Sequence, residues 1–89
     1  MQLFVRLLDN KLVVIDTSPD ETIDDVKGKV VARMEPSSLY PGPPTPEQGT
    51  FELTKKTYGQ RLAGNLTVSD HDIVNEQTLR LTFFKASII

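Results

Sequence analysis

Few side chains in this sequence could do chemistry. There is no cysteine and one histidine, His71, which lies between Asp70 and Asp72 in a segment that is predicted to turn. Nucleophilic catalysis and metal binding both need several such groups held close together. No nucleophile or second metal ligand stands at a useful spacing from His71. We therefore predict that the protein is not an enzyme, has no catalytic residue, and binds neither a metal nor a cofactor.

Composition limits the choice of partners. The 89 residues include ten lysines and arginines against twelve acidic residues, a formal net charge of −2. Such a balance does not favour binding to nucleic acid or to an anionic membrane surface. Hydrophobic residues at 38% and charged residues at 25% are typical of one soluble globular domain, which we place at residues 1–89. The start of the chain lacks the pattern of a secretory signal, so we expect a monomeric protein of the cytoplasm or nucleus.

Alternating apolar residues predict the elements that open the chain. Leu3 and Val5 fall on one face of a first run, and Val13 and Ile15 fall on one face of a second run. An Asp-Asn pair at positions 9 and 10 separates the two runs and tolerates left-handed backbone. The pattern predicts a β-hairpin.

A helix should follow the hairpin. Thr22 is the predicted N-cap, and Asp25 in the third helical position completes a short capping box. Three apolar residues at helical spacing are expected to dock on the hairpin: Ile23, Val26 and Val30. We expect the helix to end at Pro36.

The second half of the chain is predicted to supply two more strands. Five of the six prolines fall in residues 36–49, which predicts a long loop. A short strand at 51–53 and a last strand at 78–84 follow, and the last strand directs Leu79, Leu81 and Phe83 inward. The order predicts an α+β roll in which one helix packs on a mixed sheet and the first and last strands pair in parallel.

The residues also resemble the ubiquitin family. The similarity is carried by Met1 to Val5, Leu8, Lys11, Pro19, Thr22-Ile23, Val26-Lys27, Lys29, Phe51 to Leu53, Thr67 to Asp70 and Thr78 to Leu81. It implies a β-grasp fold of ββαββ order with four to five strands, a proline-rich insertion at about 36–49 and a lengthened connection at about 54–65. The implied core is Leu3, Val5, Val13, Ile15, Ile23, Val26, Val30, Phe51, Leu53, Ile73, Leu79 and Leu81.

The resemblance weakens at the C-terminus. Conjugating members of the family end in a Gly-Gly pair, whereas this sequence runs from Phe84 to Ile89 without glycine. We expect a non-conjugated ubiquitin-like domain that binds proteins and forms the N-terminal part of a longer protein. Two alternatives remain: an uncleaved segment fused to a ribosomal protein, and a covalent modifier that is processed beyond Ile89.

The positions of the family's recognition surface have changed here. They are occupied by Leu8, Glu52, Arg80 and Thr82, so that only the leucine is kept. A carboxylate at Glu52 beside Arg80 replaces the apolar centre, and burying it unpaired would cost several kcal/mol. Ordinary ubiquitin receptors should therefore bind this domain poorly.

A different apolar cluster is the preferred binding site for proteins. Strand alternation directs Phe4, Leu12 and Val14 away from the core, and Phe84 is expected to extend the cluster along the sheet. Components of the ubiquitin–proteasome system are among the expected partners. The alternative is that the helix tail, the proline-rich loop or the rest of a longer protein covers this cluster.

Lysines and prolines offer two weaker signals. Lys11, Lys27, Lys29 and Lys56 are candidate isopeptide acceptors, although solvated charge, or for Lys27 a partly buried ion pair, is the simpler interpretation. Residues 40–46 contain two overlapping Pro-x-x-Pro spacings that SH3 or WW modules could bind. No basic residue flanks them closely, which favours an inserted loop.

Overall fold

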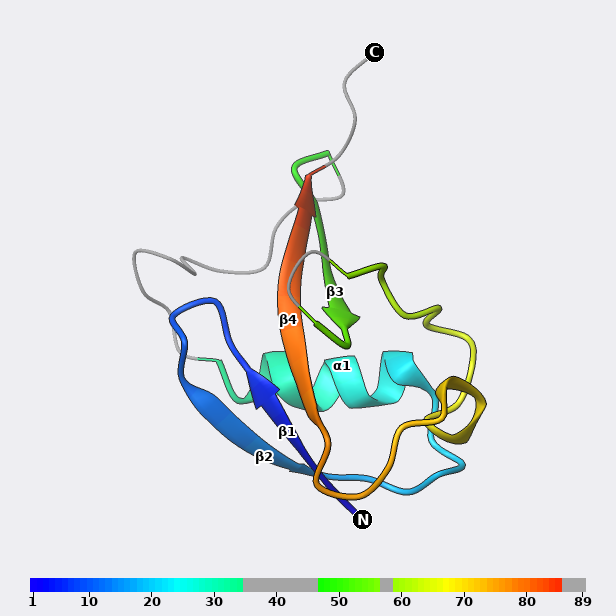
Figure 1. Ribbon diagram of the computed structural model, residues 1–89. Coiled ribbons are helices and arrows are strands. Elements are labelled where there is room, and N and C mark those ends of the chain that lie inside the picture. Colours follow the sequence, from blue (N-terminus) through cyan, green and yellow to red (C-terminus); the bar gives the residue numbers. More distant parts are fainter. Residues whose placement is uncertain (35–46, 57–58, 86–89) are drawn as a thin grey trace.

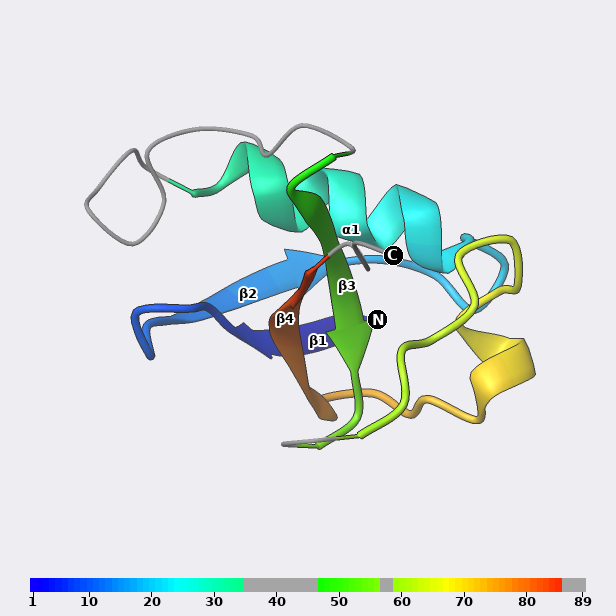
Figure 2. The ribbon, with the colours of Figure 1, turned by 90° about the horizontal axis from the view of Figure 1, so that it is seen from above.

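A mixed four-stranded sheet packs against one α-helix in the computed structural model, which describes residues 1–34, 47–56 and 59–85. The elements are β1 (Gln2–Arg6), β2 (Leu12–Asp16), α1 (Ile23–Ala32), β3 (Gly49–Thr54), the short 3₁₀ helix η1 (Ser69–His71) and β4 (Thr78–Lys85). The strand order is β2-β1-β4-β3, and α1 lies behind the sheet in Figure 1 and above it in Figure 2. The predicted α+β architecture is confirmed.

The hairpin forms as its alternation predicts. β1 pairs antiparallel with β2, and Phe4 lies opposite Val14. Asn10 in the turn has a φ of 72°, which its short polar side chain tolerates. The N–H of Lys11 donates to Oδ1 of Asp9 at 3.0 Å, and this hydrogen bond stabilises the turn.

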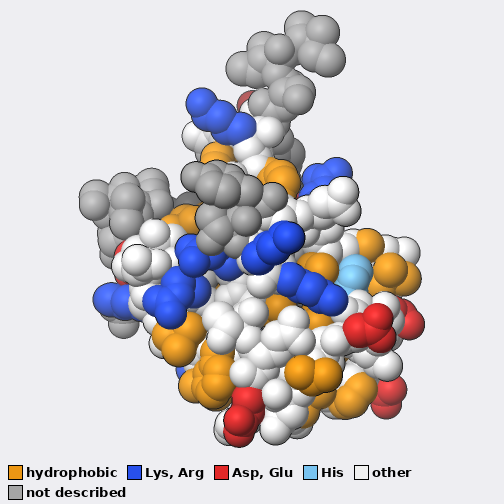
Figure 3. Space-filling view, viewed as in Figure 1, with side chains coloured by type: hydrophobic (Ala, Val, Ile, Leu, Met, Phe, Trp, Pro, Cys, Tyr) orange, Lys and Arg blue, Asp and Glu red, His pale blue; other side chains and the backbone are white. Residues whose placement is uncertain are grey.

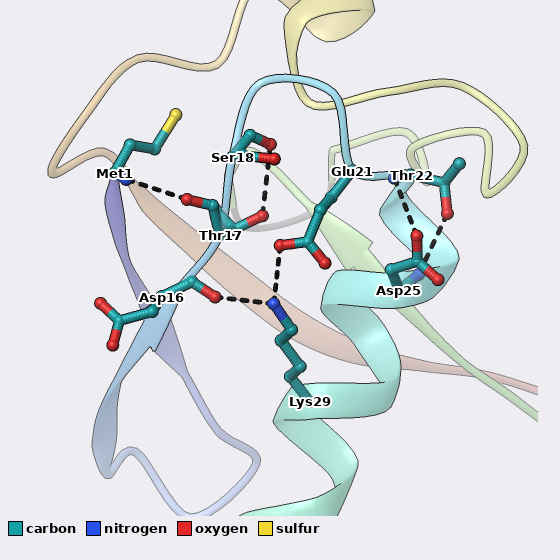
Figure 4. A network of polar contacts seen from close by, with 8 residues as sticks. All are labelled: Met1, Asp16, Thr17, Ser18, Glu21, Thr22, Asp25 and Lys29. Carbon is teal, nitrogen blue, oxygen red and sulfur yellow. Dashed lines mark hydrogen bonds and ion pairs between the residues drawn. The ribbon is translucent and has the colours of Figure 1, made fainter.

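The helix begins with the predicted capping box. The N–H of Asp25 donates to Oγ1 of Thr22, and the N–H of Thr22 donates to Oδ2 of Asp25, each at 3.2 Å (Figure 4). One turn later, Nζ of Lys29 donates to the carbonyl of Asp16 at 2.9 Å and to Oε1 of Glu21 at 2.6 Å. The hydrogen bond from Lys29 is the main cause that lowers the pKa of Glu21. These contacts tie α1 to the end of β2.

The end of the helix differs from the prediction. The α-helix stops at Ala32, where Arg33 is the C-cap and its N–H donates to the carbonyls of Val30 and Val31. Pro36 lies outside the described residues, so the helix ends before the proline is reached. The β-branched run supplies little intrinsic helix propensity, and the helix persists only while its apolar stripe packs on the sheet.

The core lies between α1 and the sheet and largely matches the prediction. It comprises Leu3, Val5, Leu7, Ile15, Ile23, Val26, Val30, Leu53, Val68, Ile73, Leu79 and Leu81. Val13 and Phe51 are only partly buried and pack at its margin, whereas Leu7 and Val68 join it without having been predicted. Leu7 directly follows β1 and continues the alternation of Leu3 and Val5, whereas Val68 lies in a turn, where strand alternation makes no prediction.

Phe83 lies on the core face with Leu79 and Leu81, as predicted, but it is not buried and is 36% exposed. β1 pairs with β4 only as far as Arg80, so Phe83 extends beyond the last residue that β1 covers. Its ring contacts Phe51 edge to face, with 5.7 Å between the ring centroids. The core therefore ends before β4 does.

The segments around β3 refine two predicted loops. Gly49, assigned to the proline-rich loop, opens β3 with a φ of 139°, and a Cβ there would overlap the Phe84 carbonyl and the Phe83 ring. Of that loop, residues 36–46 lie outside the described residues. In the 54–65 connection the chain turns back along the outer edge of β3, where the Leu62 N–H donates to the Leu53 carbonyl at 2.8 Å.

Among the residues described, no helix combines the length and the apolar character that crossing a membrane requires.

Removal of the helix cap should lower stability. In Thr22→Ala the Asp25 N–H loses its acceptor, and we expect the free energy of unfolding to fall by about 1 kcal/mol. Thr22→Ser keeps the hydroxyl and should remain close to the wild type. Urea unfolding followed by circular dichroism measures both variants, and equal losses in the two would show that the hydroxyl is not the stabilising group.

Candidate interaction surface

The sheet face opposite α1, here called the outer face, carries the predicted apolar cluster. Phe4 of β1 lies directly across from Val14 of β2, and Leu12 comes two residues before Val14 on the same face of β2. Leu12 is 48% exposed, Val14 is 41% exposed and Phe4 is partly buried. The prediction that these three side chains point away from the core is confirmed, and we call them the apolar patch.

Two arginines border the apolar patch. Arg6 lies opposite Leu12 on one side and opposite Arg80 on the other, so that two cations are neighbours across the β1–β4 pair. Nη1 of Arg6 donates to the Asn10 carbonyl at 2.9 Å, whereas Arg80 forms no ion pair within residues 1–34, 47–56 and 59–85. Figure 3 shows blue basic side chains across the middle of this face and orange ones beside them. Like charges placed opposite each other favour an anionic partner.

Arg6 was missed in the sequence. The signal that could have identified it is its alternation with Val5, which places it on the same face as Phe4.

Phe84 does not extend the apolar patch, contrary to the prediction. Phe4 pairs with Thr78, and Phe84 is six residues further along β4. At about 3.3 Å per residue, the backbone positions of Phe4 and Phe84 are about 20 Å apart along the sheet. Arg80 and Thr82 occupy the outer-face positions between them. Phe84 therefore belongs to the far end of the β3–β4 ribbon.

Glu52 lies opposite Thr82, one diagonal position from Arg80, and its carboxylate is bound by two other cations. Its Oε1 accepts from Nζ of Lys27 at 2.9 Å, and its Oε2 lies 3.5 Å from Nη1 of Arg61. The Glu52 side chain is only 15% exposed. A carboxylate so enclosed needs partners, and the helix and the segment along the edge of β3 supply one cation each.

Lys27 is the helix residue that binds Glu52. A partly buried ion pair was one of the two interpretations of this lysine in the sequence, and the structure contains it. Its ammonium also lies 3.5 Å from Oδ1 of Asp24. Burial acts to lower the pKa of Lys27, but the hydrogen bond and charge of Glu52, with the charge of Asp24, outweigh it and raise the pKa. The charged form of Lys27 is thus held in place.

Leu8, Arg80 and Thr82 are brought together at another place. They line a hollow of about 430 Å³ beside the second half of β4, and through Arg80 this hollow adjoins the border of the apolar patch. Oγ1 of Thr82 is 3.4 Å from Oγ1 of Thr54 in the neighbouring strand. Three of the predicted site residues thus form the apolar patch, three line this hollow, and Glu52 is engaged with Lys27 at the edge of the sheet.

The four candidate acceptor lysines also differ in their surroundings. Lys11 is 76% exposed and lies 3.8 Å from Asp9, and Lys56 is exposed. Lys27 and Lys29 are both held by carboxylates. Only Lys11 and Lys56 have ammonium groups that a modifying enzyme would reach without first breaking a close ion pair.

His71 and Asp70 have structural contacts. Asp70 accepts from the N–H of Thr67 at 2.9 Å, and this bond is the main cause that lowers the pKa of Asp70. A ring nitrogen of His71, Nε2, lies 3.2 Å from the Ala63 carbonyl. Within the described part of the chain, no three His, Cys, Asp or Glu side chains gather in a way that could hold a metal ion. No family model matches the sequence.

Loss of the Lys27 ammonium should lower stability in a pH-dependent way. Lys27→Met keeps most of the aliphatic stem, and we expect it to lower the free energy of unfolding at pH 7 by about 1 kcal/mol. Because the folded-state pKa of Lys27 is raised, its contribution is complete below about pH 10.4 and is lost as the pH rises through the folded value.

The difference between the wild type and Lys27→Met should therefore shrink in strongly alkaline buffer. Urea unfolding at several pH values measures it, with Lys11→Met as the matched control at an exposed lysine. A difference that stays constant through the alkaline range would contradict the assignment.

Proposed function

We propose that this chain is a ubiquitin-like domain of the β-grasp type that binds protein partners non-covalently through its outer sheet face. The arrangement of elements supports the fold: a hairpin, a capped helix, and a last strand that pairs in parallel with the first. Many of the residues that resemble the ubiquitin family lie on these elements, and others, such as Leu8 and Pro19, lie in the connections between them. Fold alone does not decide function, so the proposal rests on the surface.

The observation that carries the proposal is the apolar patch beside two arginines. Leu12 and Val14 are both more than 40% exposed next to Phe4, and all three belong to two adjacent, paired strands. Aromatic and aliphatic side chains gathered in this way are typical of the centre of a binding site, where full burial of each contributes about 1.5–3 kcal/mol.

Charge narrows the class of partner. Arg6 and Arg80 lie next to each other along one side of the patch. A partner that offers apolar side chains to the patch and a carboxylate to the arginines would match both features. Proteins of the ubiquitin–proteasome system are the first candidates because of the resemblance.

A matched pair of substitutions tests the outer face. Val14→Glu places a charge in the apolar patch, and Val74→Glu places the same charge at a valine that is 63% exposed outside it. We expect Val14→Glu to weaken binding of a purified partner by about tenfold or more and Val74→Glu to leave it unchanged. Isothermal titration calorimetry measures the affinities.

Chemical-shift mapping with the same partner locates the contact. Shifts should centre on the amides of Phe4, Leu12 and Val14. Perturbations confined to the proline-rich loop, with none on these strands, would contradict the proposal.

A further inference from the structure

The second half of β4 has an edge with which no described segment pairs. β1 pairs with β4 only from Phe4–Thr78 to Arg6–Arg80, and then the chain leaves the sheet in the β1–β2 turn. β4 continues to Lys85, and β3 pairs with its opposite edge over this whole length. Figure 1 shows β4 rising well beyond the end of β1.

Backbone donors and acceptors lie along this edge. The N–H of Phe4 donates to the carbonyl of Gln77 at 3.0 Å, so the odd-numbered residues of β4 direct their backbone groups toward the line of β1. Beyond Arg80 the same alternation exposes the carbonyl of Leu81, both groups of Phe83 and the N–H of Lys85. A strand edge of this kind is a template for another extended chain.

The hollow described above borders this edge. Five consecutive residues of β4, Arg80 to Phe84, line it together with Leu7, Leu8 and Gly59. Leu7 and Leu8 come directly after β1, so the hollow, which has a volume of about 430 Å³, lies where the chain leaves the edge of β4.

The lining specifies the chemistry of an occupant. Leu8 and Phe84 are partly buried and Phe83 is 36% exposed, so apolar surface is available beside the backbone groups. Among the described residues that line the hollow, Arg80 alone is charged, and its neighbour across the β1–β4 pair is the cation of Arg6. A carboxylate near Arg80 would relieve that repulsion.

We propose that this edge of β4 binds an extended, acidic and apolar peptide segment of a partner protein, which adds to the sheet in line with β1. A helix would not suit the edge, because its backbone groups are already paired within the helix. The apolar side chains of the segment pack on Phe83, on the core side of the sheet, and its carboxylates lie on the outer side, where they pair with Arg80. The site shares Arg80 with the surface proposed above, whereas Phe83 and the free backbone groups of β4 lie outside the apolar patch.

A synthetic peptide tests the edge directly. The probe is an acetylated and amidated six-residue peptide that alternates valine with glutamate, titrated into the ¹⁵N-labelled protein. We expect its binding to shift the amide signals of Phe83 and Lys85 downfield, as new hydrogen bonds form. The same peptide with lysine in place of glutamate should bind about tenfold more weakly or worse, and Arg80→Gln should reduce this discrimination.

Methylated peptides report the backbone pairing. The amides of an extended peptide alternate between its two edges, so N-methylation of the valines blocks one edge and N-methylation of the glutamates blocks the other. One methylated peptide should lose binding and the other should keep it. If both methylated peptides bind as well as the parent, the proposal is overturned.

Two substitutions at one position provide the matching test on the protein. Phe83→Pro removes the N–H that faces away from β3, whereas Phe83→Ala removes only the ring. We expect the proline variant to bind about fivefold more weakly than the alanine variant, the loss of one hydrogen bond. The methylated peptides decide the matter if Phe83→Pro does not fold.

Other outcomes would overturn the proposal. Absence of shifts at millimolar peptide is one. Shifts confined to Phe4, Leu12 and Val14 would place the peptide on the outer face, which would favour the proposed function while excluding the edge. A concentration-dependent dimer in sedimentation, abolished by Phe83→Pro, would assign the edge to a second copy of the chain.

Discussion

The parallel pairing of β1 with β4 is the contact on which the rest of the structure depends. It joins only Phe4 to Arg6 with Thr78 to Arg80, yet it unites the N-terminal hairpin with the β3–β4 ribbon in one sheet. Without it neither pair of strands would offer α1 a surface wide enough to bury its apolar stripe. The pairing ends at Arg6 and Arg80. Beyond that point Leu81 is the last buried side chain of β4, and one edge of β4 has no partner strand among the described residues.

The charged side chains are unevenly distributed over the surface, which the small net charge does not reveal. A formal charge of −2 suggests no special affinity for anions. Arg6 and Arg80 nevertheless meet on the outer face, while the carboxylate of Glu52 is already engaged by Lys27 and Arg61. Glu52 is therefore not available to bind a partner, whereas Arg6 and Arg80 are.

Local patterns predicted most of the fold because they depend on near neighbours in the chain. Strand alternation correctly placed Leu12 and Val14 outward and Ile15 inward, and the capping box at Thr22 and Asp25 forms as expected. The exposure of Phe83 and the position of Phe84 were wrongly predicted for one reason. Alternation gives the face of a side chain, but it does not say where along the neighbouring strand that side chain lies.

The sequence alone determined the hairpin, the capped helix, the order of elements and the residues of the apolar patch, since each follows from spacing within about ten residues. Only the tertiary structure decided that Phe84 stands about 20 Å from Phe4, that Glu52 pairs with Lys27, and that β4 extends past β1. Those facts depend on register and on strand length relative to a distant partner. Contacts between distant segments fix both, and no local pattern encodes them.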